Sequence, residues 1–235
     1  MTAGDDALVE LGGLRAISVG DRAAARVVVI LAHGFQMEPG DLSPFAHSIQ
    51  APAWFLFPEA PGVAEPRGRA WWHIDAKKRG EAMSRGPRDF MGEHPPDLPA
   101  ARARLLSFID AVRAEVGTRP LVVGGFSQGG MLTCDSVLRA RLAVDALVLF
   151  SASRICFDEW RPLLEGAPLR GLTALVSHGR ADDDLSFAAG EALRDCLTAA
   201  GADVAWVPFD EGHQIPLLVW RHLRRLLLAL ARRPP

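Results

Sequence analysis

The sequence predicts an α/β protein built on a mostly parallel β-sheet with helices on both faces. Most of six short apolar runs are nearly continuous rather than alternating, as in strands that are buried on both faces of a sheet. Helical patterns lie between most of these runs, and such alternation indicates β-α-β units with right-handed crossovers. The chain has 235 residues, 49% of them hydrophobic and 23% charged, which suits one large domain.

The elements follow one another in a regular order. The segment at about residues 8–19 is predicted to add one or two antiparallel strands at an edge of the sheet. In the last predicted helix, Leu217, Trp220 and Leu223 fall on one face, as in an amphipathic helix that packs on the sheet. The six predicted core strands span residues 27–32, 54–58, 121–125, 146–151, 173–178 and 203–208, and the four predicted helices span residues 99–116, 128–139, 187–200 and 216–232.

Composition argues against several classes of protein. A net charge of −2 offers no basic footprint for a nucleic acid. No apolar run approaches the roughly 18 residues of a membrane span, and the acidic opening of the sequence predicts no secretory signal. Cys134, Cys156 and Cys196 are odd in number and widely spaced, so we expect buried free thiols and a cytoplasmic location rather than disulfides or a zinc site.

One segment, at about residues 62–97, interrupts the alternation of strands and helices. It is rich in glycine, proline and charge, and a loop of this length in a compact domain is usually functional or partly disordered. We predict a lid-like or pocket-lining insertion within a single domain of residues 1–235. Its apolar residues Trp71, Trp72 and Phe90 either line an acyl or aryl pocket or pin the loop to the domain.

The stretch GGFSQGG contains the pattern G-x-S-x-G, with Ser127 between Gly125 and Gly129. It follows a predicted strand and precedes a predicted helix, which is the context that a nucleophile in a tight strand-to-helix turn requires. The glycines allow strand and helix to pass closely, and the helix N-terminus places backbone N–H groups beside the reacting atom. The alternative is an ordinary turn in which the serine caps the helix. We favour Ser127 as a nucleophile.

A serine nucleophile needs a histidine base, usually oriented by an acid. In this architecture the chain order is serine, acid, histidine, and the histidines after Ser127 are His178, His213 and His222. His222 lies in a helix among arginines, and His178 ends a predicted strand ahead of the candidate acids. His213 lies in the loop after the last predicted strand, from which it can reach the serine, so we predict that it is the base.

An acid is expected in the loop after the strand at residues 173–178. The sequence there offers Asp182, Asp183 and Asp184, any of which could also cap the helix that follows. Two other acids are less suitable. Glu211 lies too near His213 in sequence to orient it, and Asp158 lies in an earlier loop, after the predicted strand at residues 146–151.

The reaction also needs two N–H donors for a developing oxyanion. The N–H of Gln128, directly after the nucleophile, is one candidate, and the N–H of Phe35, in the loop LAHGFQ after the first core strand, is the other. His33 in the same loop precedes the serine in sequence. We therefore interpret it as a structural histidine that holds the loop by hydrogen bonds.

Four pieces of the sequence, LAHGFQ, GFSQGG, SHGRADD and GHQIP, together resemble the phospholipase/carboxylesterase family of α/β-hydrolases. The resemblance implies a Ser127–Asp182–His213 triad, an oxyanion hole of the Phe35 and Gln128 amides, an eight-stranded sheet, and no metal or organic cofactor. Two features depart from the family pattern. DDDLSF replaces the usual Val-Pro stretch after the acid, and the first loop lacks a second glycine after HG.

The function that follows is a cytoplasmic serine carboxylesterase, which cleaves small or medium acyl esters through an acyl-enzyme intermediate. An acyl-thioesterase or lysophospholipase would use the same residues on longer acyl chains. A non-catalytic binding protein on the same fold would be favoured by a missing triad residue, but all three types are present. The expected partner is a small acyl ester, and the chain is expected to be a monomer or homodimer.

Overall fold

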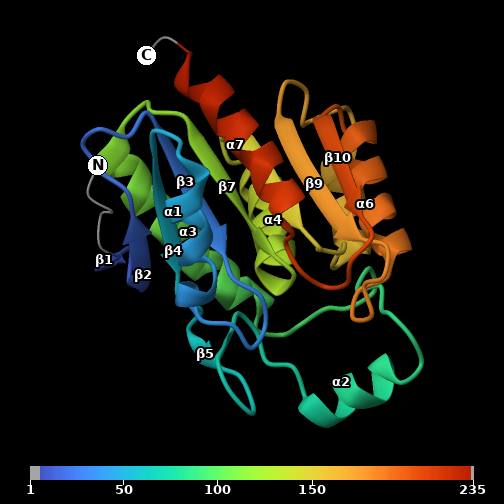
Figure 1. The fold of residues 1–235 in the computed structure, drawn as a ribbon. Helices are drawn as coiled ribbons and strands as arrows, with labels where there is room; N and C mark the ends of the chain where they lie inside the picture. Colours follow the sequence, from blue (N-terminus) through green and yellow to red (C-terminus); the bar gives the residue numbers. More distant parts are fainter. Residues whose placement is uncertain (1–5, 234–235) are drawn as a thin grey trace.

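The structure is a computed structural model that describes residues 6–233, and its centre is an eight-stranded β-sheet (Figure 1). The strand order is β1-β2-β4-β3-β7-β8-β9-β10, and all neighbours from β4 onward are parallel, whereas β2 pairs antiparallel with both β1 and β4. The strands are β1 (Ala7–Leu11), β2 (Leu14–Val19), β3 (Val27–Ala32), β4 (Ala53–Pro58), β7 (Leu121–Phe126), β8 (Ala146–Phe150), β9 (Thr173–Gly179) and β10 (Asp203–Phe209). The predicted α/β fold, its six core strands and its antiparallel edge are confirmed.

Helices cover both faces of this sheet (Figure 1). Helices α1 (Ser43–Ile49) and α7 (Leu217–Ala231) pack on one face. Helices α3 (Leu98–Val116), α4 (Gln128–Ala140) and α6 (Phe187–Ala199) pack on the other. The short elements are the 3₁₀ turns η1 (Pro39–Asp41) and η2 (Arg161–Leu164) and helix α5 (Phe157–Trp160). Within residues 6–233 no helix is long and apolar enough to cross a membrane.

Strand β3 explains why the core strands have continuous apolar sequences. Val27, Val29 and Leu31 point into the cluster beneath α1 and α7, while Val28 and Ile30 point into the cluster beneath α3 and α4. Each of these side chains is at most 2% exposed. Because successive residues of a strand face opposite sides, a sheet that is covered on both sides selects apolar residues at every position.

The segment at residues 62–97 is more ordered in structure than its sequence indicates. It contains a two-stranded sheet of β5 (Gly62–Val63) and β6 (Arg69–Ala70), followed by helix α2 (Ala76–Met83). Asp75 begins α2 by accepting a hydrogen bond from the Lys78 N–H at 2.9 Å. No residue of α2 is buried, and the helix stands apart from the layers of the sheet (Figure 1).

Candidate active site

Ser127 lies in the turn between β7 and α4, with φ 50° and ψ −117°. A non-glycine residue rarely adopts a positive φ, and such strain often occurs at functional sites. The turn is held by the Ser127 N–H, which donates to the Phe150 carbonyl at 2.9 Å, and by its carbonyl, which accepts from the Met131 N–H. The serine is 8% exposed. The strand-to-helix turn predicted from the glycine pattern is therefore present.

The glycines on either side of the serine allow strand and helix to approach each other. A Cβ on Gly125 would lie 2.5 Å from the Ala32 carbonyl oxygen and 2.6 Å from the Gly129 carbonyl carbon. A Cβ on Gly129 would overlap the same Ala32 carbonyl. All the atoms in the way belong to the backbone, so a side chain at either position would push β3, β7 and α4 apart.

Replacing Gly129 with alanine is expected to destabilise the fold by about 1–3 kcal/mol, the usual cost of overpacking a core. The free energy of unfolding, measured in urea, gives this value directly. Gly80→Ala in α2 is the matched control, because a Cβ there meets no atom within 4 Å and alanine favours helix. A Gly129→Ala variant as stable as the Gly80→Ala variant would contradict this account of the turn.

Asp182 and His213 come together at the carboxyl edge of the sheet. The Nδ1 atom of His213 lies 2.7 Å from Oδ2 of Asp182. The loops that carry them are joined because Arg180 N–H donates to the Phe209 carbonyl at 2.7 Å and Ala181 N–H donates to the Glu211 carbonyl at 3.2 Å. Asp158, the earlier alternative acid, instead contacts His94.

His213 lies on the same side as the serine turn. Its ring packs against that of Phe126, the residue before Ser127, with the centroids 4.7 Å apart. The loop is also fixed by the Ser151 hydroxyl, which donates to the Gln214 carbonyl at 3.3 Å. Among the described residues, no hydrogen bond joins the Ser127 hydroxyl to His213. The structure thus gathers the three residues at one edge, with the acid and histidine bonded.

The environment of Asp182 keeps its carboxylate ionised. Burial opposes the charge, but hydrogen bonds from His178, His213 and the Leu185 N–H outweigh it and hold the pKa of Asp182 well below its usual range. Oδ1 accepts the N–H groups of Asp184 at 3.0 Å and Leu185 at 2.8 Å. Because the pKa of Asp182 is lower in the folded chain, its carboxylate stabilises the fold at any pH above the ordinary carboxyl pKa. This stabilisation is lost as the pH falls through the pKa of the folded state.

A second histidine, His178, also contacts the acid. It is fully buried at the end of β9, and its Nε2 lies 3.0 Å from the Leu185 carbonyl and 3.3 Å from Oδ2 of Asp182. Gly190 of α6 packs directly on the ring, where a Cβ would overlap Nδ1. Sequence reasoning set His178 aside as a base. It did not foresee this contact, for which the spacing of four residues between His178 and Asp182 was the available signal.

The Phe35 amide is free to serve as a hydrogen-bond donor. The neighbouring N–H of Gly34 donates to Sδ of Met37, and those of Gln36 and Met37 donate to the carbonyls of Arg69 and Gly34. Among the described residues the Phe35 N–H has no acceptor. Gln128, the other predicted donor, is the first residue of α4, where N–H groups lack partners within the helix.

His33 has the structural position that the sequence indicates. Its Nδ1 lies 2.8 Å from the Gly34 carbonyl, and its Nε2 accepts the Ala60 N–H at 3.1 Å, which requires a neutral ring. The pKa of His33 is lowered to about 4, and burial of the ring is the main cause. The neutral imidazole therefore links the loop that bears Phe35 to the end of β4.

We expect His33 to make the fold sensitive to mild acid. Its ordinary pKa of 6.5 is above its folded pKa of about 4, so the unfolded chain binds the extra proton first. Stability then falls as the pH drops from 6.5 to 4, by ~3 kcal/mol from this group. The loss is measured as the free energy of unfolding in urea at several pH values. It should be smaller in His33→Gln than in wild type. In His222→Gln, a substitution on α7, it should equal the wild-type loss. Equal losses in both variants would contradict the assignment.

Trp71 and Trp72 fasten the insertion to the serine turn. Both are buried, at 2% and 3% exposure. The side-chain amide of Gln128 accepts the Trp71 N–H at 2.8 Å and donates to the Trp72 carbonyl at 2.9 Å, and the Trp71 indole donates to the His33 carbonyl at 2.9 Å. Of the two roles predicted for these tryptophans, pinning the loop is therefore seen directly.

The far end of the insertion is fastened to the acid loop. Asp184 pairs with Arg79 of α2 at 2.6 Å and also with Arg88. The Arg88 N–H donates to the Asp184 carbonyl at 2.9 Å. Phe90 follows and is buried, and its N–H donates to the Ser153 hydroxyl at 3.1 Å. Both ends of the insertion thus contact loops that carry site residues.

Two cavities border the predicted pocket residues. One, of about 770 Å³, lies under α2 and is lined in part by Trp72, Arg79 and Phe90. The other, of about 280 Å³, is lined in part by Trp71 and Trp72. Neither cavity is lined by Ser127, so the structure does not join these aromatic residues to the serine in one pocket.

Comparison with known sequences gives one family. The sequence model described as phospholipase/carboxylesterase matches residues 93–224, which is more than half of the chain and includes the serine turn, the aspartate loop and the histidine loop. No curated protein matches the sequence.

Comparison with solved structures supports the fold over nearly the whole chain. A carboxylesterase from Mesorhizobium loti has 19% identity and a TM-score of 0.72, covering 94% of this chain and 98% of that one. Acyl-protein thioesterase 2 from Zea mays has 18% identity and a TM-score of 0.74, covering 92% and 99%. Esterase PE8 has 20% identity and a TM-score of 0.71, covering 96% and 98%. At these identities the likeness concerns the fold.

Proposed function

We propose that this chain, which belongs to the phospholipase/carboxylesterase family, is a carboxylic ester hydrolase with Ser127 as its nucleophile. The observation that carries the proposal is the 2.7 Å contact between His213 and Asp182, formed at the same edge of the sheet as the strained serine turn. A base that is oriented by a buried acid, beside a serine in a strained turn at a helix N-terminus, is the arrangement that acyl transfer requires.

The reaction would begin with transfer of the Ser127 proton to Nε2 of His213. Because Nδ1 of His213 donates to Asp182, Nε2 is the unprotonated nitrogen that can accept it. The serine oxygen attacks the acyl carbonyl, and the amides of Phe35 and Gln128 stabilise the oxyanion. His213 then protonates the leaving alcohol, and water hydrolyses the acyl-enzyme. Nucleophile–base bonds often tighten only in the substrate complex.

We further propose a single domain in which the insertion at about 62–97 lines the approach to the serine. Support comes from its two attachments, at Gln128 beside the nucleophile and at Asp184 beside the acid. The substrate would be a small-molecule acyl ester, and no cofactor is required by this chemistry. The three free cysteines support a cytoplasmic location, where thiols stay reduced.

Labelling with a fluorophosphonate probe tests the nucleophile, because the probe reacts only with an activated serine. We expect wild-type protein to be labelled once per chain. Hydrolysis of p-nitrophenyl esters of increasing acyl length, beside acyl thioesters of matched length, then gives the preferred substrate. A higher kcat/KM on long-chain thioesters would favour the thioesterase alternative. Absence of both labelling and turnover would overturn the proposal and favour a binding protein.

A further inference from the structure

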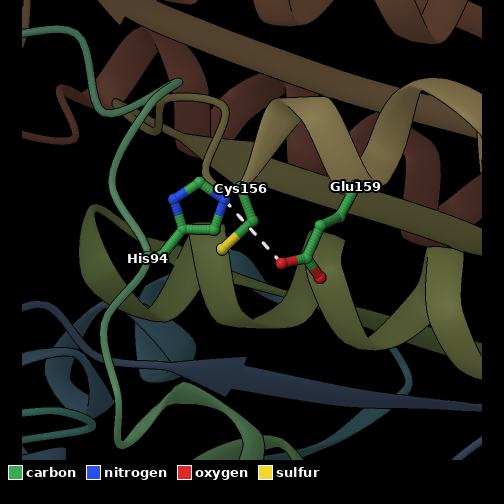
Figure 2. Close-up of side chains that lie close together, drawn as sticks. All are labelled: His94, Cys156 and Glu159. Atoms are coloured by element: carbon green, nitrogen blue, oxygen red, sulfur yellow. Dashed lines mark ion pairs between the residues drawn. The ribbon is translucent and has the colours of Figure 1, made fainter.

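Side chains with metal-binding atoms converge at the end of the insertion, where it meets α5. Nε2 of His94, Sγ of Cys156 and a carboxylate oxygen of Glu159 all lie within 4.8 Å of one another. Figure 2 shows the three groups pointing toward one another. A fourth group, the Asp158 carboxylate, has Oδ1 2.8 Å from the same Nε2. Neither the proposed triad nor the oxyanion loop uses any of these residues.

The orientation of His94 is that of a metal ligand. Its Nδ1 lies 3.1 Å from the Gly92 carbonyl, and this contact requires the proton to be on Nδ1. In the neutral ring Nε2 then presents a lone pair to Asp158 at 2.8 Å and to Oε1 of Glu159 at 3.7 Å. Two carboxylates that face Nε2 favour a positive charge there, which either a proton on Nε2 or a metal ion in its place can supply. Metal-binding histidines commonly donate their other N–H to a backbone carbonyl in this way.

The other two groups are also held in place. Cys156 has φ 47°, which is rare for a residue with a side chain, and its N–H donates to the Glu93 carbonyl at 3.1 Å. Glu159 lies three residues later, so it shares a face of the turn with Cys156. Arg139 of α4 holds Oε2 of Glu159 at 2.5 Å, which leaves Oε1 facing His94.

We propose that His94, Cys156, Glu159 and Asp158 bind a zinc ion that clamps the end of the insertion to α5. Imidazole, thiolate and carboxylate together suit Zn²⁺, whereas Mg²⁺ and Ca²⁺ select oxygen ligands alone. On binding, the Cys156 thiol releases its proton to solvent and its sulfur bonds to the metal as the thiolate, with no change of oxidation state.

The ligand atoms need only a small movement to form a tetrahedral site. Bond lengths of about 2.0–2.3 Å place ligand atoms about 3.3–3.8 Å apart. Nε2 of His94 and Oε1 of Glu159, 3.7 Å apart, already lie in this range, whereas Nε2 and Oδ1 of Asp158, 2.8 Å apart, would separate slightly. The side chains of His94, Asp158 and Glu159 are 45%, 66% and 49% exposed, so they are free to adjust. The backbones are already docked, since Phe157 N–H donates to the Met91 carbonyl at 2.8 Å. This clamp would be a third attachment of the insertion, independent of the ester chemistry.

Titration of the chelator-treated protein with Co²⁺ tests the site, because cobalt reports its ligands by absorption. We expect one Co²⁺ per chain, with the intense visible bands of tetrahedral cobalt and a near-ultraviolet thiolate charge-transfer band. Cys156→Ser should abolish the thiolate band, and His94→Gln should weaken Zn²⁺ binding at least ~10-fold in competition with a chromogenic chelator. Zn²⁺ should also raise the Tm of wild-type protein but not of either variant.

Matched controls separate the site from general binding to thiols and histidines. Cys196→Ser replaces another free cysteine, and His73→Gln replaces an exposed histidine of the same insertion; both should bind as wild type does. Circular dichroism of each variant checks folding. A cobalt spectrum without a thiolate band, or Zn²⁺ binding unchanged by both Cys156→Ser and His94→Gln, would overturn the proposal. Ester hydrolysis by all four variants is expected to persist, so the outcome is separate from that of the proposed function.

Discussion

Replacing Ser127 with alanine is expected to lower kcat/KM for a p-nitrophenyl ester by on the order of 10⁴–10⁶-fold. The hydroxyl is the group that would bond to the acyl carbon, and no other side chain of the turn can replace it. The turn itself should persist, because the contacts that hold Ser127 are made by its backbone with Phe150 and Met131. The measurement is the initial rate against substrate concentration, together with loss of fluorophosphonate labelling.

The matched control is Ser48→Ala on α1, which removes an exposed hydroxyl whose one hydrogen bond within residues 6–233 is to the Phe45 carbonyl. This variant should keep wild-type activity and labelling. Both variants should unfold at nearly the wild-type temperature, which separates loss of the nucleophile from loss of the fold. Ser127→Ala turnover within tenfold of wild type, or labelling that persists in it, would show that another serine acts.

The sheet and the serine turn could be predicted because local sequence determines them. The strand at Val27–Ala32 is apolar at every position since both faces of β3 are covered, and this pattern is visible without the structure. Gly125 and Gly129 are likewise required, because backbone atoms close to the turn leave no room for a Cβ at either position. His213 could be placed by chain order, because parallel strands bring their carboxyl ends to one edge of the sheet.

Features set by contacts between distant side chains could not be predicted. The Gln128 side chain bonds to Trp71 and Trp72, more than fifty positions away, and nothing near Gln128 indicates it. Helix α2 has no buried residue, so it lacks the apolar stripe by which the four long helices were predicted. The cluster of Cys156 with His94 and Glu159 was not predicted, because these residues meet only in the folded chain.

The attachments of the insertion at residues 62–97 favour the proposal that it lines the substrate pocket rather than opening and closing over it as a lid. Trp71 and Trp72 are bonded to Gln128, next to the proposed nucleophile, and Arg88 is bonded to Asp184, near the proposed acid. Both ends are therefore fixed to the edge that carries the candidate site. The residues between these attachments, which include α2, contain no buried residue. Fixed ends limit how far such a loop can move. We therefore expect the insertion to line the path of the substrate, with movement confined to the segment around α2.

Changing Asp182 to asparagine is expected to lower kcat by on the order of 10⁴-fold, with KM nearly unchanged. Two backbone N–H groups, those of Asp184 and Leu185, donate to Oδ1, so the amide oxygen of asparagine must occupy that position. The amide nitrogen then takes the place of Oδ2 and faces Nδ1 of His213. Because it donates, it selects the tautomer with the proton on Nε2, which cannot accept the Ser127 proton. Steady-state kinetics over the p-nitrophenyl ester series measures the split between kcat and KM.

Neighbouring aspartates supply controls that remove the same charge at different positions. Asp183 is exposed and makes no hydrogen bond among the described residues, so Asp183→Asn should leave kcat and KM unchanged. Asp184→Asn loosens Arg79 and Arg88 and should act mainly on KM, through the insertion. If instead Asp182→Asn and Asp183→Asn lowered kcat equally, the effect would come from lost negative charge rather than from the tautomer of His213. The buried position of Asp182 and its two histidine contacts argue for the tautomer.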